Sequence, residues 1–231
     1  NQKIHNRPFS NDRLINNFTG MLGRFDSGDW YLNKYKTSLG YKYVMAKNQS
    51  LTPDENIIYN GFKPDVADFV WNVKENREDE LSNRVIASIT NNYTIFPNLK
   101  LRTRLATDFT SVNIESSRPT ERPLIFDKTT GSFEVFSREY SILYGDVLLT
   151  YNKKINSDLE LNVMGGYTAS KEKGFELGRS TNGGLSVENW FDISASNNPA
   201  NSSSLRYSVI KDALIGTINL NYKSYLYIEG T

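Results

Sequence analysis

The stretch LKLRTRLATDF, residues 99 to 109, constrains the fold of this chain more than any other feature of the sequence. Leucine and phenylalanine occupy one parity of the stretch, and charged residues occupy the other. Successive side chains of a β-strand point to opposite faces of a sheet, so the stretch predicts a strand with one apolar and one charged face. In a soluble sandwich the apolar face would pack on a second sheet. In a membrane barrel it would meet lipid, and the charges would face a wet lumen.

Further segments show the same alternation of apolar and polar residues, so the chain is expected to be all-β. Their lengths suit strands of about 9 to 11 residues, the length that crosses a bilayer at a tilt. Aromatic residues on the apolar parity lie near both ends of several segments, as the aromatic girdles of membrane barrels do. Besides 99–109, the expected strands cover residues 85–95, 143–151, 158–169, 213–223 and 225–231.

The connections between these expected strands alternate between short and long. Residues 111–139 and 170–212 form long connections, and the others are short. Transmembrane barrels have short periplasmic turns and long extracellular loops, whereas a soluble sandwich has no reason to keep its short turns at one end. Arg or Lys facing lipid at the midplane would cost about 2 to 4 kcal/mol, so the charged parity should face the lumen. The sequence thus predicts a transmembrane antiparallel β-barrel with lumen-facing Lys100, Arg102, Arg104, Asp108, Asp146, Asp158 and Glu160.

The chain divides into two parts, and the sequence pattern predicts secondary structure clearly only in the second. Residues 1–80 are expected to form an extracellular, loop-rich segment, in which 10–25 could form a short amphipathic helix and a strand or two lie near 31–45. The charged run KENREDE, residues 74–80, is expected to be a solvated loop edge. Residues 81–231 hold the expected transmembrane strands with short periplasmic turns and long extracellular loops.

Composition excludes several classes of function. The net charge is +1 and no run of five basic residues occurs, so the sequence gives no case for nucleic-acid binding. The absence of cysteine excludes disulfides and thiolate metal sites, and the single histidine, His5, is expected to be an exposed loop residue. We therefore expect no metal and no cofactor. No segment approaches the roughly 18 apolar residues of a membrane-spanning helix.

Three segments carry a resemblance to a known family. They are WNVKENREDELSNRVIASITNNYTIFPNLKLRTRLATDF at 71–109, YSILYGDVLLTYNKKINSDLELNVMGGYTA at 140–169 and YKSYLYIEGT at 222–231. Across residues 69 to 231 the chain resembles the middle of the barrel of SusC/RagA-type TonB-dependent outer-membrane transporters of the Bacteroidetes. The shared segments are strand and turn sequences without catalytic content, so no ligand residue carries over.

The resemblance implies a location in the bacterial outer membrane and a barrel of about 22 strands, plugged by an N-terminal domain. It also implies energy from the TonB complex, a SusD-like lipoprotein lid over the long loops, and oligosaccharides or peptides as substrates. No TonB box, plug or C-terminal strand is recognisable in these residues. Six strands do not close a barrel, for which eight is the usual minimum, so the chain is expected to be part of a larger protein.

Two alternatives to a transporter remain open at this point. A soluble β-sandwich could bind glycans with Trp190, Trp30 or Trp71 as stacking platforms. An enzyme could use inward carboxylates such as Asp146, Asp158 and Glu160, because a glycosidase needs two carboxyl groups at a defined separation. Inward acids in a barrel more often solvate the lumen or pair with arginines, so we expect no catalytic residue.

The second long connection contains two large apolar side chains in an otherwise polar run. Trp190 and Phe191 interrupt LSVENWFDISASNNPANSSS, and large apolar groups in a wet loop need cover. One interpretation is that both rings pack under their own loop. The other is that one of them meets the lid or stacks on a sugar, since aromatic residues are favoured as interface anchors.

Overall fold

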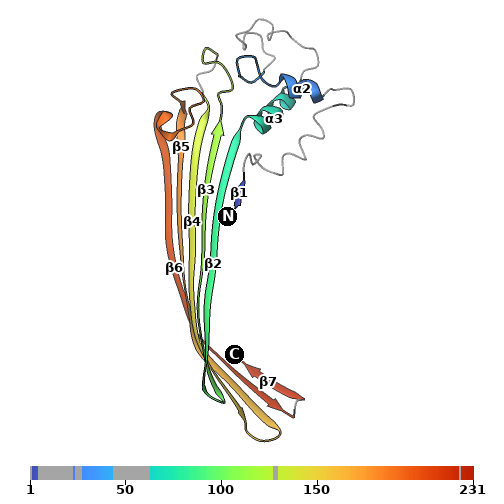
Figure 1. Cartoon of the computed structure of the whole chain (residues 1–231), viewed down its shortest axis with the longest axis vertical. Coiled ribbons are helices and arrows are strands. Elements are labelled where there is room, and N and C mark those ends of the chain that lie inside the picture. Colours follow the sequence, from blue (N-terminus) through green and yellow to red (C-terminus); the bar gives the residue numbers. More distant parts are fainter. Residues whose placement is uncertain (1, 5–22, 24–27, 44–62, 127–129, 224) are drawn as a thin grey trace. The chain divides into compact units, whose positions relative to one another are not determined.

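The computed structural model describes residues 2–4, 23, 28–43, 63–126, 130–223 and 225–231. Strands dominate these residues, and two short helices precede most of them (Figure 1). No helix in these residues is both long enough and apolar enough to span a membrane. The elements are β1 (Gln2–Ile4), α2 (Gly28–Lys34), α3 (Pro64–Lys74), β2 (Arg77–Phe96), β3 (Leu99–Arg118), β4 (Ser132–Lys154), β5 (Leu159–Leu185), the short 3-10 helix η2 (Ile193–Ala195), β6 (Ser196–Tyr222) and β7 (Leu226–Gly230).

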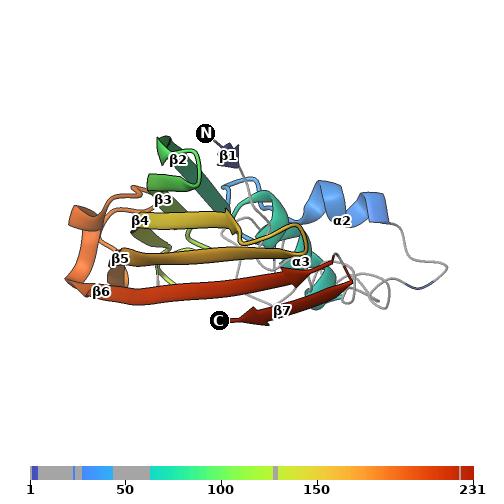
Figure 2. The ribbon, with the colours of Figure 1, turned by 90° about the horizontal axis from the view of Figure 1, so that it is seen from below.

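All the strands of the described residues belong to one open sheet whose order follows the chain, from β1 to β7. Figure 2 shows β2 to β6 side by side in this order, with β7 beside β6. Lys3 pairs with Leu81 across the β1–β2 ladder, and Leu220 pairs with Ile228 across β6–β7, both antiparallel. The described residues contain no second sheet. The expected chain-order antiparallel sheet is therefore confirmed, and a sandwich is not formed.

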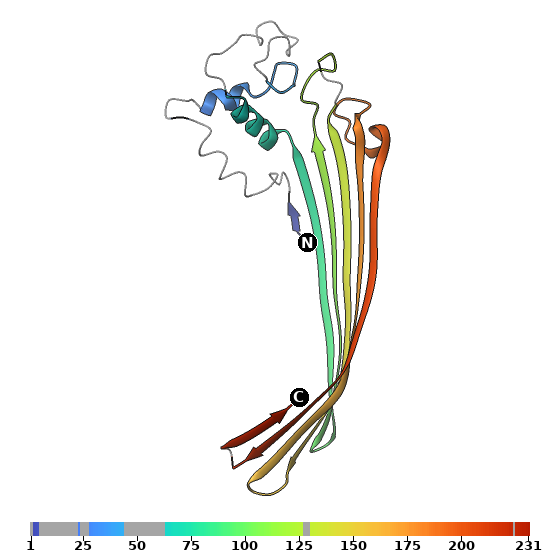
Figure 3. The same cartoon turned by 180° about the vertical axis from the view of Figure 1, so that it is seen from behind.

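The strands are longer than the apolar pattern predicts, and the two long connections are correspondingly shorter. β3 runs to Arg118 and β4 begins at Ser132, while β5 runs to Leu185 and β6 begins at Ser196 (Figure 3). The expected bounds 111–139 and 170–212 were wrong, because strand pairing continues beyond the segments in which apolar and polar residues alternate regularly. The expected short turns are present, after Phe96, after Lys154 and after Tyr222.

The segment before β2 differs most from expectation. Residues 28–34 form helix α2 instead of a strand, followed only by an isolated bridge between Lys36 and Lys42. The run KENREDE is not a loop, since Lys74 ends α3 and Arg77 begins β2. Helix α3 was not expected at all. The helix expected at 10–25 lies outside the described residues, apart from Gly23.

Helices α2 and α3 pack against each other through a small aromatic core. Tyr31 of α2 forms this core with three residues that recur on one face of α3, Val66, Ala67 and Val70. Trp71 of α3 is also fully buried, and its ring lies beside that of Tyr35, which packs against the core. Asp65 lies in the first turn of α3 and Lys74 in its last, where each complements the helix dipole.

The described residues divide into two compact units, and strands β2 to β6 contribute residues to both. The loop unit contains 1–82, 112–137 and 176–204, and thus both helices and the two longer connections. The band unit contains 83–111, 138–175 and 205–231, and thus most of the residues expected to span a membrane. Each unit is described by itself below.

Candidate functional site

One face of the band unit is apolar and uncovered. Val147 on β4 is 48% exposed, Ile89 on β2 is 69% exposed and Leu214 on β6 is 85% exposed. All three belong to the parity that the sequence assigns to lipid. A row of large apolar side chains of this extent on a soluble protein would mark an interaction surface or favour aggregation. The same parity also exposes Val85, Tyr93, Leu105, Phe109, Leu143, Leu149, Tyr167 and Ile218.

The opposite parity carries charges that pair across neighbouring strands. Arg104 on β3 donates from Nε to Oδ2 of Asp146 on β4 over 2.7 Å, and Nη2 of Arg102 lies 3.5 Å from Oδ1 of Asp146. Arg104 also donates to the hydroxyl of Tyr144. The side chain of Asp146 is fully covered, whereas the two arginines stay about 40% exposed. Inward acids were expected to pair with arginines, and Asp146 forms such a pair with both.

The other charged residues expected on this face differ in whether they form ion pairs. Asp108 accepts from Nε of Arg84 over 2.9 Å. Asp158 lies in the turn before β5 and not in a strand, where Nζ of Lys223 lies 3.5 Å from its carboxylate. Lys100 and Glu160 form no ion pair within the described part of the chain. Whether these side chains line a lumen remains a prediction.

The charged face also includes residues that the sequence did not single out. Arg84 lies one residue before the expected strand 85–95, and Tyr144 was read only as part of a polar parity. Lys211 on β6 donates to Glu172 on β5 over 2.9 Å. Both of these residues fell inside the expected loop 170–212, so no alternation pattern could have paired them.

Replacing Arg104 by alanine should lower the melting temperature of the intact barrel in detergent by a few degrees. The change leaves the covered Asp146 carboxylate with only the more distant Arg102, and an uncompensated covered charge is costly. The double change of Arg104 and Asp146 to alanine should destabilise less, because it removes that charge. Melting curves of the three proteins test this, and a double variant no more stable than the Arg104→Ala single variant would contradict it.

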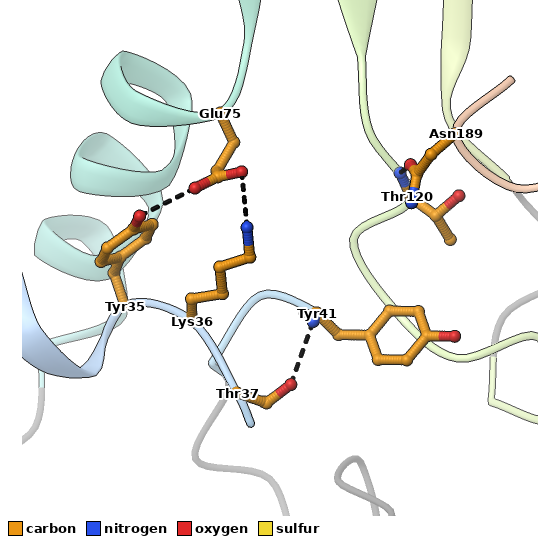
Figure 4. A network of polar contacts seen from close by, with 7 residues as sticks. All are labelled: Tyr35, Lys36, Thr37, Tyr41, Glu75, Thr120 and Asn189. Atoms are coloured by element: carbon orange, nitrogen blue, oxygen red, sulfur yellow. Dashed lines mark hydrogen bonds and ion pairs between the residues drawn. The ribbon is translucent and has the colours of Figure 1, made fainter. Parts of the chain in front are cut away.

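In the loop unit, polar contacts tie α3 to the segment that follows α2 (Figure 4). The hydroxyl of Tyr35 donates to Oε1 of Glu75 over 2.8 Å, and Nζ of Lys36 donates to Oε2 of the same residue over 2.9 Å. Burial, and then the hydrogen bond to Glu75, raise the pKa of Tyr35 to about 12. The Tyr35 hydroxyl is therefore a protonated donor at neutral pH.

The same segment contacts both of the longer connections. Lys42 donates to Glu121 over 2.6 Å, and the hydroxyl of Tyr41 donates to Glu188 over 2.9 Å. The two connections contact each other where the backbone N–H of Thr120 donates to Oδ1 of Asn189, which adopts a positive φ of 60° (Figure 4). Hydrogen bonds thus join residues 35–43, 119–126 and 186–195 to one another.

The candidate aromatic platforms fall into different environments. Trp71 is fully buried in α3 and has no face open to a ligand, whereas Trp30 packs against the helix core and stays partly exposed. Phe191 is half-buried, and its ring centroid lies 6.5 Å from that of Phe133 on strand β4. Trp190 is 58% exposed. Of the candidates, Trp190 is the most exposed to solvent.

Among the comparisons with known proteins, only the one with solved structures found similar proteins, and it identifies the fold of the chain. No protein-family model matches the chain, and no curated protein matches it. Among solved structures it is similar to the RagAB peptide transporter, with a TM-score of 0.61 and 16% identity over 68% of this chain. The RagAB peptide importer gives a TM-score of 0.61 in its open-open state and 0.55, at 17% identity, in its closed-closed state. The chain spans 17 to 18% of the length of these structures. It has the fold of part of a SusC/RagA-type barrel.

Proposed function

We propose that this chain forms part of the barrel wall of a TonB-dependent transporter in a bacterial outer membrane. The observation that carries the proposal is the two-faced sheet of the band unit. Its apolar parity is exposed at Val147, Ile89 and Leu214, whereas on its charged parity ion pairs join neighbouring strands. Lipid on one side and a wet lumen on the other satisfy both faces at once. The shared fold with part of the RagAB barrel supports the same arrangement.

The partners and substrate follow from this proposal. The sheet is open at β1 and β7, so further strands of the intact barrel would pair with these edges. The similar structures are of a peptide transporter, which favours a peptide over an oligosaccharide as substrate. A SusD-like lipoprotein would cover the loop unit, with the exposed Trp190 as a contact candidate. The TonB complex would act on other parts of the intact protein.

Single-cysteine spin labelling tests the assignment of the two faces. The chain has no cysteine, so labels can be placed at Val147 and Ile218 on the apolar parity and at Asn162 and Thr150 on the charged parity. The intact protein, with cysteines elsewhere replaced, is reconstituted in lipid vesicles. Labels on the apolar parity should be relaxed mainly by oxygen, which concentrates in lipid. Labels on the other parity should be relaxed mainly by a water-soluble nickel complex.

Two outcomes would contradict the proposal. Equal access of the nickel complex to all four labels would mean that no face meets lipid. Protection of Val147 and Ile218 from both reagents would mean that protein covers the apolar face, as in a sandwich. Either result would remove the transporter wall as the function of this sheet.

A further inference from the structure

The apolar face of the band unit ends in a shallow hollow lined by rings and cations. Phe109 of β3, Lys173 and Phe175 of β5, and Arg206 of β6 line it together with serines of β4 and β6. Its volume is about 350 Å³. Lys173 and Phe175 continue the parity of Tyr167 along β5, so the hollow lies on the apolar face, where that face first becomes charged.

The cations of the hollow differ from those of the charged face in having no acidic partner. Arg84, Arg104 and Lys211 each contact a carboxylate on a neighbouring strand. Within the described residues, neither Lys173 nor Arg206 lies within ion-pair distance of an acid. Arg206 instead places its guanidinium 4.7 Å above the ring of Phe175, which holds the cation against the sheet.

The charge in the hollow favours an anion. Lys173 and Arg206 contribute two positive charges, and Glu139 contributes one negative charge, so the balance is positive. Serine hydroxyls at 141 and 208 add hydrogen-bond donors, and the rings of Phe109 and Phe175 add apolar surface. A phosphate group attached to an apolar body would satisfy all of these groups, because guanidinium and ammonium ions bind phosphate oxygens well.

We propose that this hollow binds the phosphate-bearing headgroup of a membrane lipid, with Lys173 and Arg206 as the phosphate ligands. The inference rests on the proposed function, since it needs the apolar face to meet lipid. Acyl chains would then lie along Leu143, Tyr167 and the neighbouring apolar side chains, while the phosphate sits where the apolar band ends. Basic residues at the edge of an apolar band are attracted to anionic headgroups, and the binding free energy per residue depends on the lipid composition.

Lipid A is the probe for the experiment, because it carries phosphate on a large apolar body. The intact protein is placed in phosphatidylcholine nanodiscs with increasing lipid A, and native mass spectrometry counts the bound lipid A. The Lys173→Gln, Arg206→Gln double variant should bind lipid A about 30-fold more weakly, at a loss of about 1 kcal/mol per cation. Arg206→Lys, which keeps the charge, should retain most of the binding.

The matched control removes the same charge from the opposite parity. Lys100→Gln with Lys211→Gln should leave lipid A binding within about twofold of the wild type, since these side chains face away from lipid. Undiminished binding by the Lys173, Arg206 double variant would overturn the inference, and so would an equal loss in the control. Displacement of lipid A by millimolar inorganic phosphate alone would also overturn it, because the site would then be one for soluble anions.

The two proposals fail in distinguishable ways. If the spin label at Val147 lies in lipid but lipid A binding does not depend on Lys173 and Arg206, the headgroup site is wrong and the barrel wall stands. If the label at Val147 does not lie in lipid, the barrel wall itself is wrong.

Discussion

Arginine in place of Val147 should strongly reduce the amount of folded barrel in the outer membrane. Val147 is exposed at the middle of β4 on the apolar parity, and it lines a shallow groove with Leu105 and Tyr167. An arginine facing lipid near the bilayer midplane costs about 2 to 4 kcal/mol, which is a large part of the stability of an ordinary domain. The measurement is the fraction of heat-modifiable barrel in isolated outer membranes, compared with the wild type.

The matched control for this change is Thr150→Arg. Thr150 lies three residues further along the same strand and on the opposite parity, so its arginine would point to the charged face. The control should fold at close to the wild-type level. Equal losses for both variants would show that the strand tolerates arginine on neither face, and a tolerated Val147→Arg would show that the apolar face does not meet lipid.

The sequence predicted those strands that have one apolar and one polar face. Leu101 with Leu105, and Val147 with Leu149, mark the apolar face clearly because large apolar residues recur there at every second or fourth position. The turn at Pro97 and Asn98 was also visible, since proline and asparagine favour turns. The order of the sheet followed from these short turns, because a hairpin joins antiparallel neighbours.

The strand extensions could not be predicted from the same pattern. Residues 176–184 of β5 and 197–204 of β6 are mostly small and polar on both parities, as loops are. Their pairing is stabilised by backbone hydrogen bonds between neighbouring strands, and the lack of a side chain at Gly178 leaves room for that of Ser203. Hydropathy does not record these interactions, so the extended hairpins were read as loops 170–212 and 111–139.

Only those charged residues of the candidate site that lie in clearly alternating strands were predicted from the sequence. Arg102, Arg104 and Asp146 were recognised because each lies within a clear strand. The pair of Glu172 and Lys211 was missed because both residues fell inside the expected loop 170–212, where no strand was predicted. The hollow at Lys173 and Arg206 was missed for the same reason.

Alanine in place of Trp71 should unfold the pair of helices in the loop unit. Trp71 is fully buried in α3, where its ring lies 6.4 Å from that of Tyr35, and Tyr35 in turn packs against the core of Val66 and Tyr31. Removing a buried tryptophan side chain costs about 3 to 5 kcal/mol, and two helices of this length have little else to stabilise them. Amide hydrogen exchange over residues 64–74 of the intact protein should lose its protection.

Phenylalanine at the same position separates the loss of packing from the loss of the indole. Nε1 of Trp71 has no hydrogen-bond partner among the described residues, so removing this donor sacrifices no bond and relieves an unsatisfied buried group. Trp71→Phe should therefore keep most of the protection. Exchange in residues 138–154 and 159–175 of the band unit should change in neither variant, because the ion pairs and the apolar face there include no residue of the helix core. Full protection of 64–74 in Trp71→Ala would mean that contacts outside this core hold α3 in place.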